Sequence, residues 1–128
     1  MLAPEITVTK VSGILETEPM YVQEQPKFLN MVCEATTELA PLQVLQKLQN
    51  AERAAGRKEY IHNQPRVIDI DLLFYADEII KTPELTIPHP KIAERGFVLI
   101  PMSEIAPDFV HPILGVTIRE LRDRLKQV

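Results

Sequence analysis

The stretch Pro65-Arg66-Val67-Ile68-Asp69-Ile70-Asp71-Leu72-Leu73-Phe74 decides the fold, because its almost continuous apolar run is typical of a buried β-strand. Asp69 and Asp71 interrupt this run two residues apart, so on a strand both side chains point to the same face. Neighbouring carboxylates repel each other and resist removal from water. A divalent cation, most simply Mg²⁺, would stabilise the pair, and Arg66 stands close enough to serve the same site. The alternative interpretation is an edge strand with a solvated polar face.

Length, charge and cysteine content limit the class of protein. The 128 residues suit one domain over positions 1–128, and a net charge of −4 argues against a nucleic-acid partner. No apolar run approaches a membrane span and no signal-peptide pattern opens the chain, so we expect no membrane association. The single Cys33 cannot form an internal disulfide, which favours a cytoplasmic protein.

Apolar periodicity predicts an order of β-β-α in the first half of the chain. Alternation indicates strands over residues 6–15 and 28–37, which we expect to pair antiparallel. A helix is predicted to start within Leu39-Ala40-Pro41, with Pro41 in its first turn, and to end at Gly56. The residues that follow the helical spacing of an inward face are Leu42, Leu45, Leu48, Glu52 and Ala55.

The second half predicts β-β-α-α, so the fold class is α+β, with helices on the faces of a mainly antiparallel sheet. The central strand is expected over residues 67–75, and a return strand over 79–81 completes a hairpin. An extended segment at 85–87 precedes His89, which we place in a rigid proline-framed bend. The remaining expected elements are a helical turn at 91–94, an apolar helix at 97–105 with Pro101 near its start, and a helix from Thr117, its N-cap, to about Lys126.

Two acidic metal ligands together with several arginines indicate phosphoryl transfer, where catalysis depends on positioning and charge neutralisation. Arg57 and Arg66 bracket a polar loop that could close on phosphates, and His89 and Arg95 follow the proline-rich turn. Alternatives stay open at this point. The arginines could be solvated, His89 could be bonded to backbone, and two aromatic residues, Phe28 and Phe97, would ordinarily belong to the core. His62 and His111 are expected at the surface.

Several ordered motifs give the chain a resemblance to the 6-hydroxymethyl-7,8-dihydropterin pyrophosphokinase family, from about Ile6 to Leu121. Besides the opening stretch, the motifs are Thr7-Val8-Thr9-Lys10-Val11-Ser12, Glu16-Thr17-Glu18-Pro19, Gln25-Pro26-Lys27-Phe28-Leu29-Asn30, Leu85-Thr86-Ile87-Pro88-His89-Pro90, Glu94-Arg95-Gly96-Phe97-Val98-Leu99 and Glu104-Ile105-Ala106-Pro107. The resemblance implies a ferredoxin-like layered sheet. It also implies Mg²⁺-dependent transfer of the β,γ-pyrophosphoryl group of ATP to the hydroxymethyl oxygen of a reduced pterin, with release of AMP. We expect a monomer or homodimer.

The resemblance also implies a role for each matching residue. Two Mg²⁺ ions would be held by Asp69 and Asp71, and Arg57 and Arg66 would act from a catalytic loop. The residues that match ATP-binding positions are Gln49, Glu52, Leu85, Thr86, His89 and Arg95. Those that match pterin-binding positions are Thr17, Glu18, Met20, Phe28, Asn30 and Phe97, with the two phenylalanines sandwiching the pterin ring.

Two departures from the family pattern change the expectations. The family usually has Trp-Gly before Pro-Arg, where this chain has Ile61-His62-Asn63-Gln64, so His62 or Lys58 is a candidate substitute. The family also begins with a strand, a turn and a helix that have no counterpart in this sequence. We therefore expect the 128 residues alone to be weakly active or inactive. The main alternative is a truncated relative that binds nucleotide or pterin without catalysis, or that serves as an assembly partner; a generic Asp-x-Asp hydrolase or sugar transferase explains none of the other motifs.

Overall fold

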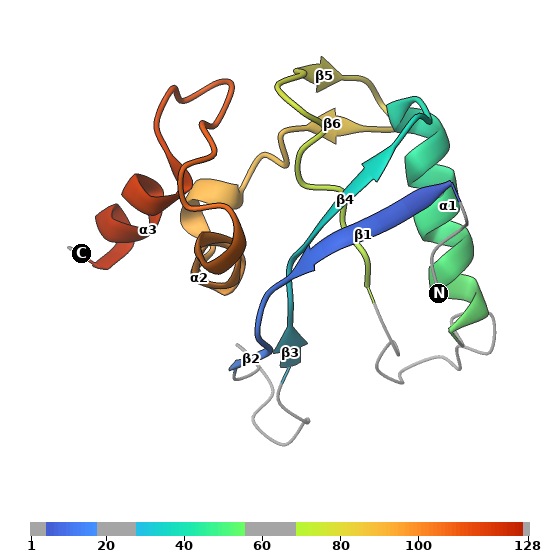
Figure 1. The fold of residues 1–128 in the computed structure, drawn as a ribbon. Helices are drawn as coiled ribbons and strands as arrows, with labels where there is room; N and C mark the ends of the chain where they lie inside the picture. Colours follow the sequence, from blue (N-terminus) through green and yellow to red (C-terminus); the bar gives the residue numbers. More distant parts are fainter. Residues whose placement is uncertain (1–4, 18–27, 56–68, 127–128) are drawn as a thin grey trace.

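The computed structural model describes residues 5–17, 28–55 and 69–126, and these ranges form an α+β fold with antiparallel strand pairs (Figure 1). The predicted class is therefore confirmed. In chain order the elements are β1 (Ile6–Val11), β2 (Leu15–Thr17), β3 (Phe28–Asn30), β4 (Cys33–Thr37), α1 (Pro41–Ala54), β5 (Ile80–Lys81), β6 (Thr86–Ile87), the 3-10 helix η2 (Ile92–Glu94), α2 (Gly96–Ile105) and α3 (Ile118–Lys126).

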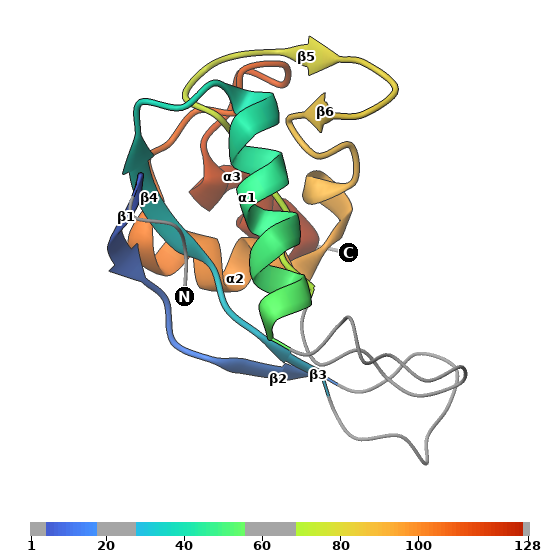
Figure 2. The ribbon, with the colours of Figure 1, turned by 90° about the vertical axis from the view of Figure 1, so that its right-hand side faces the viewer.

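The two predicted N-terminal strands pair antiparallel, as expected, but each is divided in two. β1 pairs with β4, from Ile6 opposite Thr37 to Val11 opposite Cys33, and β2 pairs with β3. The register of the first pair shifts between Val8 and Lys10, which is the signature of a β-bulge. The result is a bent two-stranded ribbon, and the β2–β3 end reaches away from α1 (Figures 1 and 2).

Helix α1 begins at Pro41, the last residue of the predicted starting segment 39–41, but its buried face differs from the expected one. Its buried residues are Val44, Leu48 and Glu52, which are spaced four apart, whereas Leu42 is 46% exposed. The predicted inward position of Leu42 is therefore wrong. The stripe that packs on Ile6 is centred on Val44 and Leu48, and this rotation of the helix leaves Leu42 at the surface.

The predicted central strand is wrong over the residues that the structure describes, since residues 69–75 join no strand pair; residues 67 and 68 lie outside the described ranges. The backbone groups of this segment bond elsewhere. The N–H of Ile70 donates to the Glu52 carboxylate at 2.6 Å, and the carbonyl of Leu73 accepts from the N–H of His89 at 3.0 Å. A side chain and a loop thus take the place of a neighbouring strand.

Segment 69–75 lies between two hydrophobic clusters. Ile70, Leu72 and Tyr75 pack on the cluster of Ile6, Val44 and Leu48, whereas Leu73 and Phe74 pack on the cluster formed mainly by α2 and α3. Figures 1 and 2 show the corresponding layers, with α1 on one side of this segment and α2 and α3 on the other. The segment therefore connects both halves of the core, although it is not a strand.

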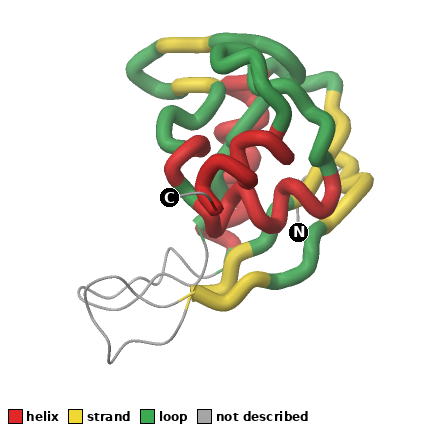
Figure 3. Tube along the Cα trace, turned by 90° about the vertical axis from the view of Figure 1, so that its left-hand side faces the viewer, coloured by secondary structure: helices red, strands yellow, loops and turns green. Residues whose placement is uncertain are grey.

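The hairpin expected after the central strand is also different. β5 pairs with β6, Ile80 opposite Ile87, so the return strand finds its partner later in the chain rather than earlier. Figure 3 shows these two short strands joined and flanked by loops at one end of the molecule.

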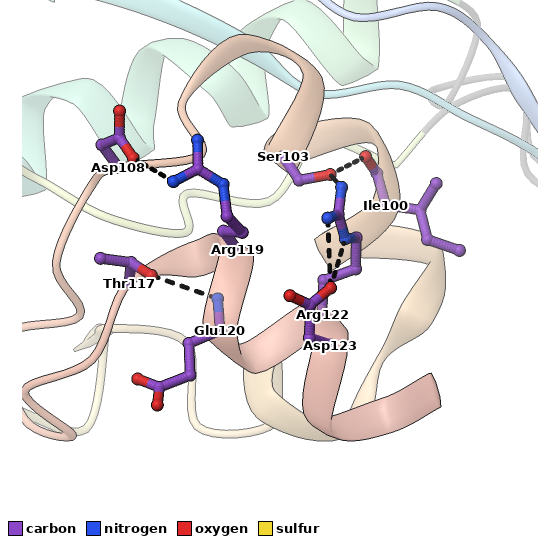
Figure 4. Close-up of polar contacts among 8 residues, drawn as sticks. All are labelled: Ile100, Ser103, Asp108, Thr117, Arg119, Glu120, Arg122 and Asp123. Carbon is purple, nitrogen blue, oxygen red and sulfur yellow. Dashed lines mark hydrogen bonds and ion pairs between the residues drawn. The ribbon is translucent and has the colours of Figure 1, made fainter. Parts of the chain in front are cut away.

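The C-terminal helices are close to the prediction. Thr117 caps α3, since its Oγ1 accepts from the N–H of Glu120 at 3.1 Å. In Figure 4 the Arg122 guanidinium reaches from α3 to Ser103 Oγ on α2, at 3.1 Å, and Arg119 pairs with Asp108 at 2.7 Å. Pro101 lies inside α2 rather than near its start.

His111 is buried, which corrects its expected surface position. Its ring meets Phe74 edge-on, with the ring centroids 5.4 Å apart. Among the residues that the structure describes, no helix combines the length and the apolar character required to cross a bilayer.

Candidate functional site

An open cleft of about 290 Å³ lies where segment 69–75 passes β6 and the proline-framed bend. The lining comes from helix α1, from segment 69–75, from the region of β6 and from the bend that follows it. It consists of Leu45, Ile70, Asp71, Leu72, Glu84, Leu85, Thr86, His89 and Pro90. Four of the residues singled out from the sequence, Asp71, Leu85, Thr86 and His89, are therefore brought together at one surface.

The two aspartates occupy an exposed part of segment 69–75. Both side chains are exposed, and Asp71 belongs to the described lining of the cleft whereas Asp69 does not. The residue between them, Ile70, is fixed by the hydrogen bond from its N–H to Glu52 and by packing on α1. The aspartates are thus anchored through a partly buried neighbour, although the strand expected to align them is absent from residues 69–75.

His89 is held at the cleft by its own backbone. Its N–H donates to the carbonyl of Leu73 at 3.0 Å, and its carbonyl accepts from the N–H of Ile92 at 3.4 Å. Its Nδ1 accepts a long hydrogen bond, 3.4 Å, from the N–H of Lys91, which leaves the proton of the neutral ring on Nε2. The bend therefore presents the histidine in a defined orientation.

Burial lowers the pKa of His89, and the positive charges of Arg95 and Lys91 lower it further, whereas Asp71 raises it. The imidazole is consequently neutral near pH 7, a donor through Nε2–H. These influences also show that Asp71, His89 and Arg95 belong to one electrostatic neighbourhood. A cation beside a carboxylate at an open cleft suits a ligand that carries both anionic oxygens and a metal ion.

Arg95 and Phe97 stand together at the start of α2. The guanidinium carbon of Arg95 lies 5.4 Å from the centroid of the Phe97 ring, in the range of a cation–π contact. Phe97 is 38% exposed, so the interpretation as an ordinary core residue is wrong. The pair presents a charged group and an aromatic face side by side at a helix start.

The other nucleotide candidates differ in accessibility. Leu85 is buried and Thr86 exposed, and both line the cleft. Gln49 is exposed on α1, outside the described lining. Glu52 is buried and binds the Ile70 N–H, so it supports the wall that carries the aspartates.

The pterin candidates fall mostly on the β2–β3 hairpin. Asn30 ends β3, half-buried, opposite Leu15, and the backbones of Thr17 and Phe28 pair with each other. The side chains of Thr17 and Phe28 lie outside the described part of the structure. The same holds for four residues in full: Glu18, Met20, Arg57 and Arg66. Lys58 and His62 are outside it as well.

Sequence reasoning missed Glu84, which adds a carboxylate to the cleft beside Leu85. Its position directly before the Leu85-Thr86 motif was the available signal. The cleft-facing positions of Leu45 and Ile70 were missed too, because apolar periodicity alone assigns such residues to the core.

The donor set around Asp69 and Asp71 fits a hard divalent cation. Both groups offer carboxylate oxygens at an open surface, and Mg²⁺ is usually held by one or two carboxylates while waters and phosphates complete its shell. Within residues 5–17, 28–55 and 69–126, no three His, Cys, Asp or Glu side chains gather into a metal-binding group. Asp69 and Asp71 are therefore the residues of this surface that could hold such an ion.

A family profile and individual relatives that resemble this chain carry the same enzyme description. Residues 1–107 match the sequence profile described as 7,8-dihydro-6-hydroxymethylpterin-pyrophosphokinase. The chain is 38% identical over 117 residues to the 2-amino-4-hydroxy-6-hydroxymethyldihydropteridine pyrophosphokinase of Aquifex aeolicus, which covers 91% of this chain and 73% of that protein. The chain is 44% identical over 100 residues to the protein of the same name from Bacillus subtilis. The matched region covers 78% of this chain and 60% of that protein.

Longer proteins also match. The folic acid synthesis protein fol1 of Pneumocystis carinii is 43% identical over 120 residues, which is 94% of this chain and 16% of that protein. The chain spans only 16% to 18% of the length of this relative and of its counterparts from Dictyostelium discoideum and Schizosaccharomyces pombe.

Proposed function

Because the chain belongs to the 7,8-dihydro-6-hydroxymethylpterin-pyrophosphokinase family, we propose that it catalyses a Mg²⁺-dependent pyrophosphoryl transfer in folate biosynthesis. The β,γ-pyrophosphoryl group of ATP moves to the hydroxymethyl oxygen of 6-hydroxymethyl-7,8-dihydropterin, and AMP is the second product. The observation that carries this proposal is the gathering of Asp71, Leu85, Thr86 and His89 around one open cleft. We place the reaction in the cytoplasm, as the single cysteine suggests.

The proposed reaction is one displacement at phosphorus. The hydroxymethyl oxygen of the pterin forms a bond to the β-phosphorus of ATP, and the bond from that phosphorus to the α,β-bridging oxygen breaks. AMP leaves with that oxygen, and the hydroxyl proton is released to solvent. Because the protein does little covalent chemistry in such a transfer, its residues act by binding, orienting and neutralising charge.

The cleft supplies groups for the triphosphate. His89 offers a neutral Nε2–H donor whose direction is set by the Lys91 N–H on Nδ1. Arg95 supplies a positive charge in the same neighbourhood. Arg57 and Arg66 are proposed to complete the phosphate contacts, because guanidinium groups bind phosphate oxygens in a bidentate manner.

Asp69 and Asp71 would hold Mg²⁺, as two ions in the arrangement that the family resemblance implies. When bound, Mg²⁺ neutralises the phosphate oxygens and draws charge away from the β-phosphorus. Glu52 keeps the aspartates in place by accepting from the Ile70 N–H between them. Leu85 and Thr86 are proposed to contact the nucleotide, and Gln49 of α1 is proposed to do the same.

The pterin is proposed to bind between α2 and the β2–β3 hairpin. Phe97 provides an exposed aromatic face and Asn30 a polar edge, and α2 contacts both β2 and β3. A flat heteroaromatic ring requires stacking surfaces and a few fixed hydrogen-bonding groups, which these residues offer. Phe28 and the backbone of residues 17–20 are proposed to complete the site.

Calorimetry followed by a product assay tests this function. The chain is titrated with a non-hydrolysable ATP analogue and Mg²⁺, then with the reduced pterin, and AMP is measured with ATP itself. The proposal expects nucleotide-dependent binding of pterin and a slow formation of AMP that requires Mg²⁺ and pterin together, in keeping with the weak activity expected of these 128 residues. Binding of both ligands without AMP would instead support a non-catalytic relative.

A further inference from the structure

The strand pair β1–β4 meets the strand pair β2–β3 at a junction that is held by hydrogen bonds of Ser12 and Gly13. Ser12 and Gly13 connect β1 to β2, and Val32 stands opposite them before β4. The Ser12 N–H donates to the Val32 carbonyl at 2.9 Å, and the Val32 N–H donates to Ser12 Oγ at 2.9 Å. A serine hydroxyl thus takes the position of a backbone carbonyl, and Ser12 is buried.

The next residue, Gly13, presents its backbone N–H to helix α2. The Gly13 N–H donates to Glu104 Oε1 at 2.8 Å, across 91 positions of sequence. A hydrogen bond to a carboxylate is roughly twice as strong as a neutral one, so it holds the Gly13 N–H close to α2. A side chain on α2 therefore tethers the point from which the β2–β3 hairpin departs.

The position of Glu104 on α2 gives the tether its relevance. Glu104 follows Phe97 by seven residues, about two helical turns, so the two side chains lie on the same face of the helix. Leu15, two residues after Gly13, pairs with Asn30. One face of α2 therefore carries both the aromatic ring proposed to stack on the pterin and the group that holds the hairpin bearing Asn30.

We propose that Glu104 is a positioning residue for the pterin, which sets the hairpin of β2 and β3 at the correct separation from Phe97 by binding the Gly13 N–H. Ser12 supports this role because its hydroxyl accepts from the Val32 N–H and donates to the Gly13 carbonyl at 2.8 Å, which orients the Gly13 backbone. The inference rests on the proposed function. It adds a requirement that falls on pterin binding and leaves the nucleotide cleft, lined by other elements, unaffected.

The test compares Glu104→Ala with Glu104→Gln, since the carboxamide oxygen of glutamine can accept the same hydrogen bond. Pterin affinity is measured by calorimetry with the non-hydrolysable ATP analogue and Mg²⁺ bound, and nucleotide affinity is measured separately. We expect Glu104→Ala to weaken pterin binding about tenfold, equivalent to one lost charge-assisted hydrogen bond. Nucleotide affinity should change less than about twofold, and Glu104→Gln should recover most of the pterin affinity.

A matched control and an independent readout keep the outcomes distinct. Glu120→Ala removes an exposed glutamate of α3 and should leave both affinities unchanged. Hydrogen exchange at the Gly13 amide should accelerate in Glu104→Ala and stay slow in Glu104→Gln. Equal loss of both affinities, or an unchanged pterin affinity in Glu104→Ala, would overturn the inference alone. A wild-type chain that binds neither ligand would contradict the proposed function as well.

Discussion

The carboxylate of Glu52 accepts a hydrogen bond from the backbone N–H of Ile70 at 2.6 Å, and Ile70 lies between the two aspartates of the central segment. Glu52 is only 5% exposed, so the bond is shielded from water. The position of Asp69 and Asp71 is therefore set by a side chain of α1 and not by a sheet.

Replacing Glu52 should lower both stability and activity. Glu52→Ala leaves the Ile70 N–H without its acceptor, which costs about 1–3 kcal/mol, whereas Glu52→Gln keeps an acceptor oxygen and should cost less. Urea unfolding at pH 7 measures the difference. The exposed Gln46→Ala on the same helix is the control and should change stability by less than about 0.5 kcal/mol. Equal stability of Glu52→Ala and the wild-type protein would contradict this account of α1.

Asp71→Asn should reduce turnover by about 10²-fold or more, because the amide removes a charged ligand at the cleft and weakens charge neutralisation. The Mg²⁺ concentration required for half-maximal turnover should rise. Asp77→Asn is the matched control, since Asp77 is exposed in the turn that follows the same segment. An Asp71→Asn protein with wild-type turnover and the same Mg²⁺ dependence would exclude Asp71 as a ligand.

The buried His111 should make the fold less stable in mild acid. Its Nδ1 accepts from the N–H groups of Ile113 and Leu114, at 3.2 and 3.1 Å, and burial lowers its pKa. The unfolded chain therefore binds the proton more readily. The free energy of unfolding should be highest above the ordinary histidine pKa of about 6.5 and fall as the pH drops below it.

His111→Asn tests this pH dependence. Asparagine can accept from the same backbone groups in an Asx-type turn, but it does not titrate. Urea melts at pH 7.5 and 5.5 should therefore show a smaller loss of stability in the variant. His89 contributes in the same direction, because its pKa is also lowered, so His89→Gln serves as the comparison. An identical loss in His111→Asn and the wild-type chain would refute the assignment to His111.

Neighbouring residues of α2 should differ sharply in their contribution to the core. Leu99 is fully buried and Ile100 is 42% exposed. Leu99→Ala should therefore cost about 2–5 kcal/mol through lost packing and a residual cavity, and Ile100→Ala less than about 1.5 kcal/mol. Chemical denaturation of the two variants measures both values. Equal costs would mean that α2 packs by another face.

Local sequence patterns predicted the elements whose signals are contained within a few residues. Pro41 marks the start of α1, Thr117 caps α3, and the prolines around His89 define its bend. Propensity and capping act over one or two turns, so a single sequence carries them. The ordered motifs also identified the family, and they singled out four residues of the cleft lining.

Long-range pairing could not be predicted in the same way. An apolar run such as residues 67–74 predicts a strand. Whether its backbone pairs with a neighbouring strand depends on segments that are far away in sequence. The Ile70 N–H bonds to the side chain of Glu52 and not to a neighbouring strand. Strand β5 pairs with β6 and not with the central segment. The burial of His111 likewise depends on Phe74, 37 positions earlier.

Phosphorus NMR of a complete reaction tests the central claim most directly. The chain is incubated with ATP, Mg²⁺ and 6-hydroxymethyl-7,8-dihydropterin, and the phosphorus resonances are followed with time. We predict that the ATP signals are replaced by AMP and by the two signals of a diphosphorylated pterin, in equal amounts and only when the pterin is present. Formation of ADP and inorganic phosphate, or unchanged ATP in a protein that binds both substrates, would contradict pyrophosphoryl transfer.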